Sequence, residues 1–92
     1  MITSWQHKGL KLFYDTGNTK GIQTKHKTRL TIILQRLDAA IEPDDLNLPG
    51  MHFHRLKGKL KDYYSVAVSG SWRIIYRFEA GNAILVNYLD YH

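Results

Sequence analysis

The chain has 92 residues, enough for one domain over residues 1–92 and too few for two. It has no cysteine, which excludes disulfide bonds and thiolate metal sites and fits a reducing cytoplasm. We expect neither export nor membrane insertion, because the sequence shows no basic-then-apolar leader and no apolar run of about 18 residues. Thirteen Lys and Arg against eight Asp and Glu give a formal net charge of +5, which favours RNA or DNA as a partner, although many ordinary small proteins are also basic.

The first half of the chain predicts helices. Residues 2–5 suit a short opening strand, and Leu10, Phe13 and Tyr14 then recur at helical spacing until Gly17, a suitable C-cap. Residues 24–41 form the strongest predicted helix, because apolar residues recur there at offsets of three and four. This apolar stripe consists of Leu30, Ile33, Leu34, Leu37 and Ile41.

The other side of this second helix is basic. Its cations, together with one that precedes the helix, are Lys20, Lys25, Lys27, Arg29 and Arg36. We give equal weight to two interpretations: a track that follows a phosphate backbone, and a solvated helix face that keeps the domain in solution.

Residues 42–50 (EPDDLNLPG) indicate a connection between the helical half and a β half, because they contain two prolines, a glycine and three acids. Asp44 and Asp45 resemble a pair of magnesium ligands. We favour the alternative that they are turn residues next to Pro43 whose carboxylates bond to the local backbone.

The second half of the chain predicts four strands, at residues 51–56, 63–69, 72–78 and 83–89. Gly70 and Gly81 stand in short connections between them, as antiparallel hairpins require. The order of one strand, two helices and a meander of strands predicts an α+β domain, with both helices on one face of a mainly antiparallel sheet.

The third strand of the meander has two different faces. Alternation places Trp72, Ile74, Tyr76 and Phe78 on an apolar face and Arg73, Ile75 and Arg77 on the other. Guanidinium groups on a rigid strand suit a phosphate, because each can donate two parallel hydrogen bonds. The alternative is an ion pair with an acid at the sheet edge, and we favour that alternative for Arg77.

Histidines suggest two kinds of chemistry. Strand alternation places His52 and His54 on one face, and His92 follows the last strand. Three imidazoles suit a zinc site with an open position, but the adjacent Lys and Arg charges would repel a cation, so we expect no metal and no cofactor. RNA cleavage without a metal needs a base for the ribose 2′-hydroxyl, an acid for the departing 5′-oxygen and cations around phosphorus. Two histidines with Lys57 and Arg73 suit that chemistry.

Four segments spread over the whole chain carry a family resemblance: residues 7–10 (HKGL), 54–58 (HRLKG), 71–74 (SWRI) and 90–92 (DYH). In this combination the chain resembles the HigB-like branch of the RelE superfamily, bacterial toxins of type II toxin–antitoxin pairs. The resemblance implies a cytoplasmic, ribosome-dependent endoribonuclease that cuts messenger RNA in the decoding site and leaves a 2′,3′-cyclic phosphate. It also implies a cognate antitoxin, usually with a helix-turn-helix that represses the shared operon.

Residue by residue, the resemblance implies that His54 and His92 are the base and the acid, in either order. Lys57 and Arg73 correspond to the phosphate and transition-state cations, and Asp90 and Tyr91 to groups that orient His92 or the substrate base. We expect further RNA or ribosome contacts from the basic residues Lys20, Lys25, Lys27, Arg29, Arg36, Arg55, Lys59 and Lys61. Arg55 departs from the family pattern, in which proline is frequent, and should loosen the local turn and add a cation.

Two other functions fit the same sequence. One is a non-catalytic RNA- or ribosome-binding module, in which Tyr63, Tyr64 and Tyr91 stack on bases. The other is a toxin of the same fold that inhibits a different target, such as DNA gyrase. The fold alone does not decide between these activities.

Overall fold

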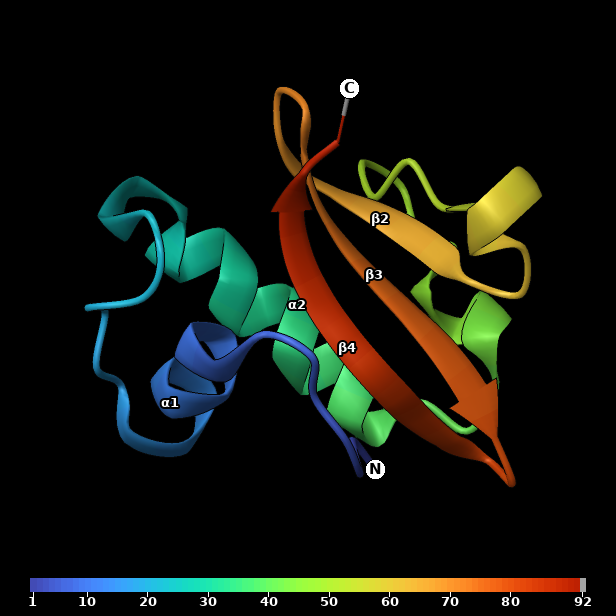
Figure 1. Cartoon of the computed structure of the whole chain (residues 1–92), viewed down its shortest axis with the longest axis horizontal. Helices are drawn as coiled ribbons and strands as arrows, with labels where there is room; N and C mark the ends of the chain where they lie inside the picture. The colour runs from blue at the N-terminus through green and yellow to red at the C-terminus, as the bar shows by residue number, and fades with distance from the viewer. Residues whose placement is uncertain (92) are drawn as a thin grey trace.

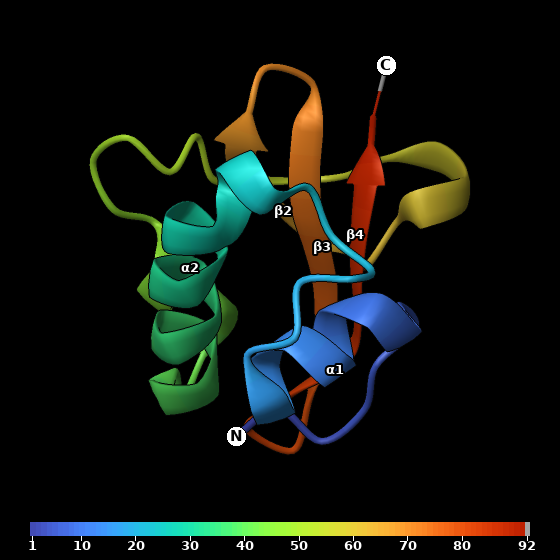
Figure 2. The same ribbon diagram turned by 90° about the vertical axis from the view of Figure 1, so that its left-hand side faces the viewer.

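In the computed structural model, which describes residues 1–91, two helices cover one face of a four-stranded antiparallel sheet (Figure 1). The helices are α1 (Lys8–Thr16) and α2 (Lys27–Ala39), and Figure 2 shows both of them in front of the sheet. The strands are β1 (His54–Arg55), β2 (Tyr64–Ser69), β3 (Trp72–Glu79) and β4 (Asn82–Asp90), and they lie in chain order. The short 3-10 turns are η1 (Thr24–His26), η2 (Pro43–Leu46) and η3 (Gly58–Leu60). This arrangement confirms the predicted α+β fold.

Both ends of α1 are capped by side-chain or backbone hydrogen bonds. At its start, His7 Nδ1 accepts a hydrogen bond from the Leu10 N–H at 2.9 Å. At its end, Gly17 adopts the left-handed conformation with φ of 81°, and its N–H donates to the Phe13 carbonyl at 2.7 Å. The predicted C-cap is therefore confirmed, and Leu10 and Phe13 are buried as their spacing indicated.

The helix α2 is shorter than predicted. It ends at Ala39, and Ile41 is 78% exposed, so the assignment of Ile41 to the apolar stripe is wrong. The chain leaves the helix at Ala40, whose ψ of 142° is extended. Pro43 keeps Glu42 extended as well, because a residue that precedes proline avoids the helical conformation. Asp45 Oδ2 accepts from the N–H groups of Ile41 and Glu42 at 2.9 and 3.2 Å, which confirms the turn interpretation. The other stripe residues are fully buried: Leu30, Ile33, Leu34 and Leu37.

The N-terminal segment lies along β4. Parallel bridges join Ile2 to Ala83 and Trp5 to Val86, so the predicted opening strand is present only as two isolated bridges. Strands β2, β3 and β4 agree with the predicted ranges to within one residue at each end. Within residues 1–91, no helix is long and apolar enough to cross a membrane.

The predicted strand at residues 51–56 is mostly wrong, because β1 contains only His54 and Arg55. Met51 is buried in the core, and its carbonyl accepts from the Ala67 N–H at 2.8 Å. His52 then has a φ of 48°, in the left-handed region, which interrupts the extended chain. Regular alternation therefore does not relate His52 to His54.

The two faces of β3 agree with the predicted alternation. Ile74 and Tyr76 are fully buried in the core beside the helices, whereas Arg73 and Arg77 on the opposite face are half-buried. The ion pair that we favoured for Arg77 is wrong: its guanidinium lies over the Tyr63 ring, 5.9 Å from the centroid. In the described part of the chain, the one ion pair joins Lys11 to Asp15. The basic residues that we predicted for the site therefore form no ion pair within that part.

Candidate active site

The sheet face that points away from the helices gathers several of the predicted site residues. His54 pairs with Ser65 across β1 and β2, and Arg73 pairs with Leu89 across β3 and β4. Residues that are paired in an antiparallel sheet point to the same face. Ala67, two residues after Ser65 on β2, pairs with Arg73, so His54, Ser65 and Arg73 share this face. Tyr91, two residues beyond Leu89, follows the same alternation.

One backbone carbonyl connects the predicted histidine to the predicted cation. The His52 oxygen accepts from Arg73 Nη2 at 3.0 Å and lies 3.1 Å from His54 Nδ1. Since a carbonyl only accepts, His54 Nδ1 must carry a proton in this bond. The neutral ring then has its lone pair on Nε2, the form that a general base needs. The residue that supplies this carbonyl, His52, is the one in the left-handed conformation.

Arg73 is fixed from a second side by Ser65, which is fully buried and whose Oγ accepts from Arg73 Nε. Burial lowers the pKa of Arg73, and the nearby Tyr91 hydroxyl opposes that shift. Arginine nevertheless keeps its charge at neutral pH. Within residues 1–91, no hydrogen bond uses the Nη1 donors, which leaves them for a phosphate.

The end of β4 lies beside the turn between β2 and β3, where the C-terminal end of the described chain is drawn (Figure 1). The Ser71 hydroxyl donates to Asp90, and the Ser71 carbonyl accepts from the Tyr91 N–H at 2.8 Å. Asp90 pairs with Trp72, so alternation places Asp90 on the helix side of the sheet and Tyr91 on the opposite side. His92 lies outside the described residues.

Lys57 lies on the loop after β1 rather than in the bonded group around Arg73. It follows the buried Leu56 and precedes Gly58, which has a φ of 69°, and its side chain is exposed. It lines a cavity of about 390 Å³ whose other walls come from Arg55, Leu56, Gly58, Lys61 and Asp62. Lys59 and Lys61 are exposed in and just after η3.

The basic residues that we predicted as RNA contacts do not form one patch. Lys25, Lys27 and Arg36 are exposed around α2, on the other side of the sheet from Arg73. Arg29 ties α2 to the sheet, because its Nε and Nη2 donate to the Ala67 carbonyl at 3.2 and 3.0 Å. Its Nη2 also donates to the Gly50 carbonyl at 2.7 Å. Arg55 lies over the Tyr64 ring at 5.3 Å, and Lys20 lines a cavity with His7, Trp72 and Tyr88.

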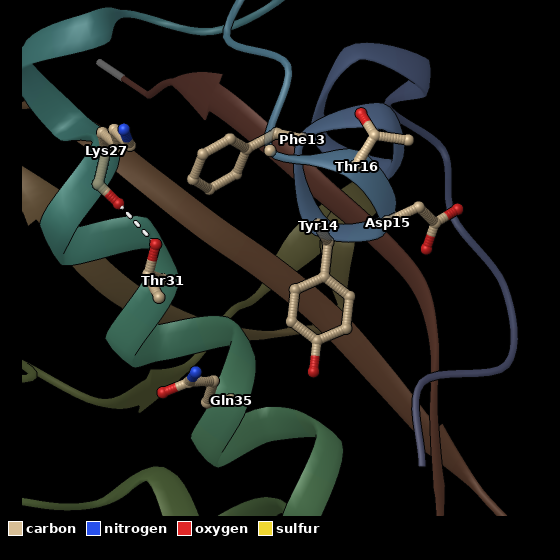
Figure 3. A pocket seen from close by; sticks show the side chains of 8 residues that line it. Phe13, Tyr14, Asp15, Thr16, Lys27, Thr31 and Gln35 are labelled. Carbon is tan, nitrogen blue, oxygen red and sulfur yellow. Dashed lines mark hydrogen bonds between the residues drawn. The ribbon is translucent and has the colours of Figure 1, made fainter.

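A separate cavity of about 280 Å³ lies between α1 and α2 (Figure 3). Phe13 and Tyr14 face it from α1, and Thr31 and Gln35 from α2. Lys27 is the one predicted site residue on its wall. Residues 1–91 contain no group of three His, Cys, Asp or Glu that could hold a metal, and the zinc alternative also needs His92, outside that range.

Sequence reasoning missed two groups that hold the site together. Ser65 had a visible signal, since it is a hydroxyl in the otherwise apolar run of β2 (YSVAV). The His52 carbonyl had none, because a backbone oxygen turned by a left-handed residue leaves no mark in the side-chain pattern.

Two solved structures share the fold of this chain. The YoeB–YefM complex from Staphylococcus aureus superposes with a TM-score of 0.64 at 17% identity, covering 100% of this chain and 95% of that one. The YoeB dimer from the same organism gives 0.60 at 16% identity, covering 100% and 93%. The chain therefore has the fold of these YoeB structures.

Sequence comparison identifies the branch. The family model described as "RelE-like toxin of type II toxin-antitoxin system HigB" matches residues 3–92. Endoribonuclease HigB from Proteus vulgaris is 41% identical over 92 residues, all of both chains. Toxin HigB-1 from Vibrio cholerae serotype O1 is 35% identical over 94 residues, covering 100% of this chain and 98% of that protein. The chain belongs to the HigB family of RelE-like toxins.

Proposed function

We propose that this toxin is a ribosome-dependent endoribonuclease that cuts messenger RNA in the cytoplasm and so stops translation. Identity of 41% to Endoribonuclease HigB over the full chain supports RNA cleavage. The observation that carries the mechanism is the His52 carbonyl, which joins the His54 imidazole to the Arg73 guanidinium. The proposed base and the proposed phosphate-binding cation thus bond to the same backbone oxygen.

The reaction begins with the base. Neutral His54, with its proton on Nδ1, takes the 2′-hydroxyl proton of the ribose at Nε2. The 2′-oxygen forms a bond to phosphorus, and the bond from phosphorus to the 5′-oxygen of the next nucleotide breaks. His92 then gives a proton to that departing oxygen. The products are a 2′,3′-cyclic phosphate and a free 5′-hydroxyl, and each proton transfer contributes about 10² to 10⁴ in rate.

Arg73 stabilises the charge that accumulates on the phosphate oxygens. Its Nε and Nη2 are already fixed by Ser65 and the His52 carbonyl, so its Nη1 donors reach the phosphate without reorganisation. Lys57 adds a second positive charge from the exposed loop after β1. Tyr91, close enough to Arg73 to influence its pKa, and Asp90 orient the acid or the substrate base.

The dependence on the ribosome follows from how open this site is. His54 and Lys57 are exposed, and the cavity beside Lys57 has charged side chains and few groups that could read a base. A nuclease with so few substrate contacts needs a second macromolecule to hold the RNA in the reactive geometry, and we propose that the ribosomal decoding site does so. Apart from Lys11, the Lys and Arg side chains form no ion pair with another described residue, and such a positive surface suits ribosomal RNA.

A cognate antitoxin neutralises the toxin. Its contact surface should be acidic, since the toxin carries a net charge of +5 and one ion pair among the described residues. The membership in a type II toxin–antitoxin family and the fold shared with the toxin of the YoeB–YefM complex support such a partner. We expect the antitoxin to carry a helix-turn-helix that represses the operon.

The test maps RNA ends in cells after brief expression of the wild-type chain and of His92→Ala. We expect new ends within translated codons for the wild type, and neither ends nor growth arrest for the variant. Ribosome binding should remain in both, measured by co-sedimentation. Toxicity that survives both His92→Ala and His54→Ala would instead support the toxin that inhibits another target, and binding without cleavage by the wild type would support the RNA-binding module.

A further inference from the structure

A buried histidine supports the strand end of the candidate site from behind. His26, the last residue of η1, is 2% exposed, and its Nδ1 lies 2.6 Å from the Tyr88 hydroxyl oxygen. The Gln23 N–H donates to the same oxygen at 3.4 Å. The Tyr88 hydroxyl therefore joins the buried imidazole to the backbone of the segment that precedes η1.

His26 also packs against Trp72. The two ring centroids are 5.6 Å apart, and those of Trp72 and Tyr88 are 4.8 Å apart. In the described part of the chain, His26 Nε2 is the one buried side-chain nitrogen or oxygen without a hydrogen-bond partner. Burial of an unsatisfied polar atom costs free energy that a phenylalanine at the same place would avoid. A phenylalanine could fill the same space as His26, but it could not form the hydrogen bond to Tyr88.

This cluster connects directly to the end of β4. Tyr88 precedes Asp90 by two residues on the same strand, and Trp72 is paired with Asp90 across the sheet. Ser71, next to Trp72, bonds to the Asp90 side chain and to the Tyr91 backbone. Arg73 is held separately, by Ser65 and the His52 carbonyl on the β2 side. The base and the phosphate cation thus have one anchor, and the strand end has another.

We propose that His26 is a positioning residue that, through Tyr88 and Trp72, fixes the strand end with Asp90 and Tyr91 for RNA cleavage. The inference rests on the proposed function, because that function gives these two residues their part in the reaction. A loose strand end spends less time in the reactive geometry, which lowers kcat. Arg73 and the ribosome contacts set substrate binding, so KM remains unchanged.

The surroundings of His26 favour its neutral form. Burial, and then the charge of Lys25, lower its pKa. His7 also packs against the Tyr88 ring, with centroids 5.3 Å apart, and burial lowers the pKa of His7 as well. Burial raises the pKa of Tyr88, so its hydroxyl remains a donor at neutral pH.

The kinetic test compares His26→Phe, Tyr88→Phe and the double variant in cleavage of ribosome-bound mRNA. We expect each single change to lower kcat by about 10-fold to 100-fold with KM unchanged, and the double variant to be no worse than the singles, because one bond is lost in all three. Tyr14→Phe is the matched control. It also removes one hydroxyl, bonded to Asp38 at 2.8 Å between α1 and α2, and should leave kcat at the wild-type value.

Hydrogen exchange of the Tyr91 amide, measured by NMR, tests the anchor without cleavage. Its bond to Ser71 should open more often in His26→Phe than in Tyr14→Phe, giving faster exchange in the former. Equal exchange in both variants, or a wild-type kcat in His26→Phe, would overturn the inference. A fully active His54→Ala in the same assay would show that the proposed mechanism is wrong, and the exchange rate would still decide whether His26 fixes the strand end.

Discussion

The two sides of the candidate site are held by different kinds of contact. On the β1–β3 side, His54 and Arg73 both bond to the His52 carbonyl, and Arg73 also bonds to Ser65. Within residues 1–91, these bonds leave His54 Nε2 and Arg73 Nη1 unused. On the β4 side, the strand end rests on a buried cluster of His26 and Tyr88 beneath Trp72. Groups that contact RNA must stay accessible and can be fixed only through their unused atoms, whereas a strand end can be supported entirely from the core.

The largest effect should come from removing the base. We expect His54→Ala to lower the rate of mRNA cleavage on the ribosome by about 10² to 10⁴, because the 2′-hydroxyl proton then has no acceptor. The free energy of unfolding should barely change, since the His54 side chain is exposed. Single-turnover cleavage and thermal unfolding measure the two quantities.

His52→Ala is the control for that prediction. It removes an exposed imidazole two residues away but keeps the carbonyl that holds His54 and Arg73. Cleavage should remain near the wild-type rate. A loss as large as that of His54→Ala would show that the His52 side chain, and not its carbonyl, takes part in the site.

A substitution in the core on the helix side of the sheet should lower stability and leave cleavage unchanged. Leu34 is fully buried in the core between α2 and the sheet, so Leu34→Ala should cost about 2 to 5 kcal/mol of unfolding free energy. Cleavage per folded molecule at low temperature should be unchanged. Denaturant unfolding and parallel activity measurements test this. A loss of activity while Leu34→Ala remains folded would contradict the separation of core residues from site residues.

Ser65→Ala sharpens the comparison of the two anchors. Loss of the Ser65 hydroxyl leaves Arg73 Nε without its buried partner and should cost about 1 to 3 kcal/mol of stability. In the proposed mechanism Arg73 both binds the phosphate and stabilises the charge that accumulates on it, so KM should rise and kcat should fall, in contrast to the effect of Tyr88→Phe on kcat alone. Steady-state kinetics of both variants test this, and an identical pattern in the two would mean that the anchors are not separate.

The smallest expected effect is the dependence of stability on pH. Burial lowers the pKa of His26 and of His7 below their ordinary value of 6.5, so below pH 6.5 the unfolded chain binds more protons than the folded one. This contribution to stability is complete above pH 6.5 and is lost as the pH falls below it. The melting temperature should therefore fall from pH 7.5 to pH 5, and less in His26→Phe. A rise over the same range would contradict the assignment.

The sequence predicted most of the fold, because apolar periodicity and glycine turns are local signals. The α2 stripe and the alternation in β3 came directly from residue spacing, and both are present apart from Ile41. The region around β1 was less predictable, since a left-handed His52 interrupts what looks like a strand. The role of His26 could not be predicted either, because its bond to Tyr88 joins residues 62 positions apart.

The most direct test of the mechanism is a single 2′-deoxy nucleotide at the cleaved position of a ribosome-bound mRNA. In the proposed mechanism the 2′-hydroxyl is both the proton donor to His54 and the nucleophile, so its removal should abolish cleavage at that position, while toxin binding to the ribosome should remain. The matched all-ribose mRNA should be cut, with a 2′,3′-cyclic phosphate on the upstream fragment. Cleavage of the deoxy substrate at the same phosphate and rate would contradict the proposed chemistry.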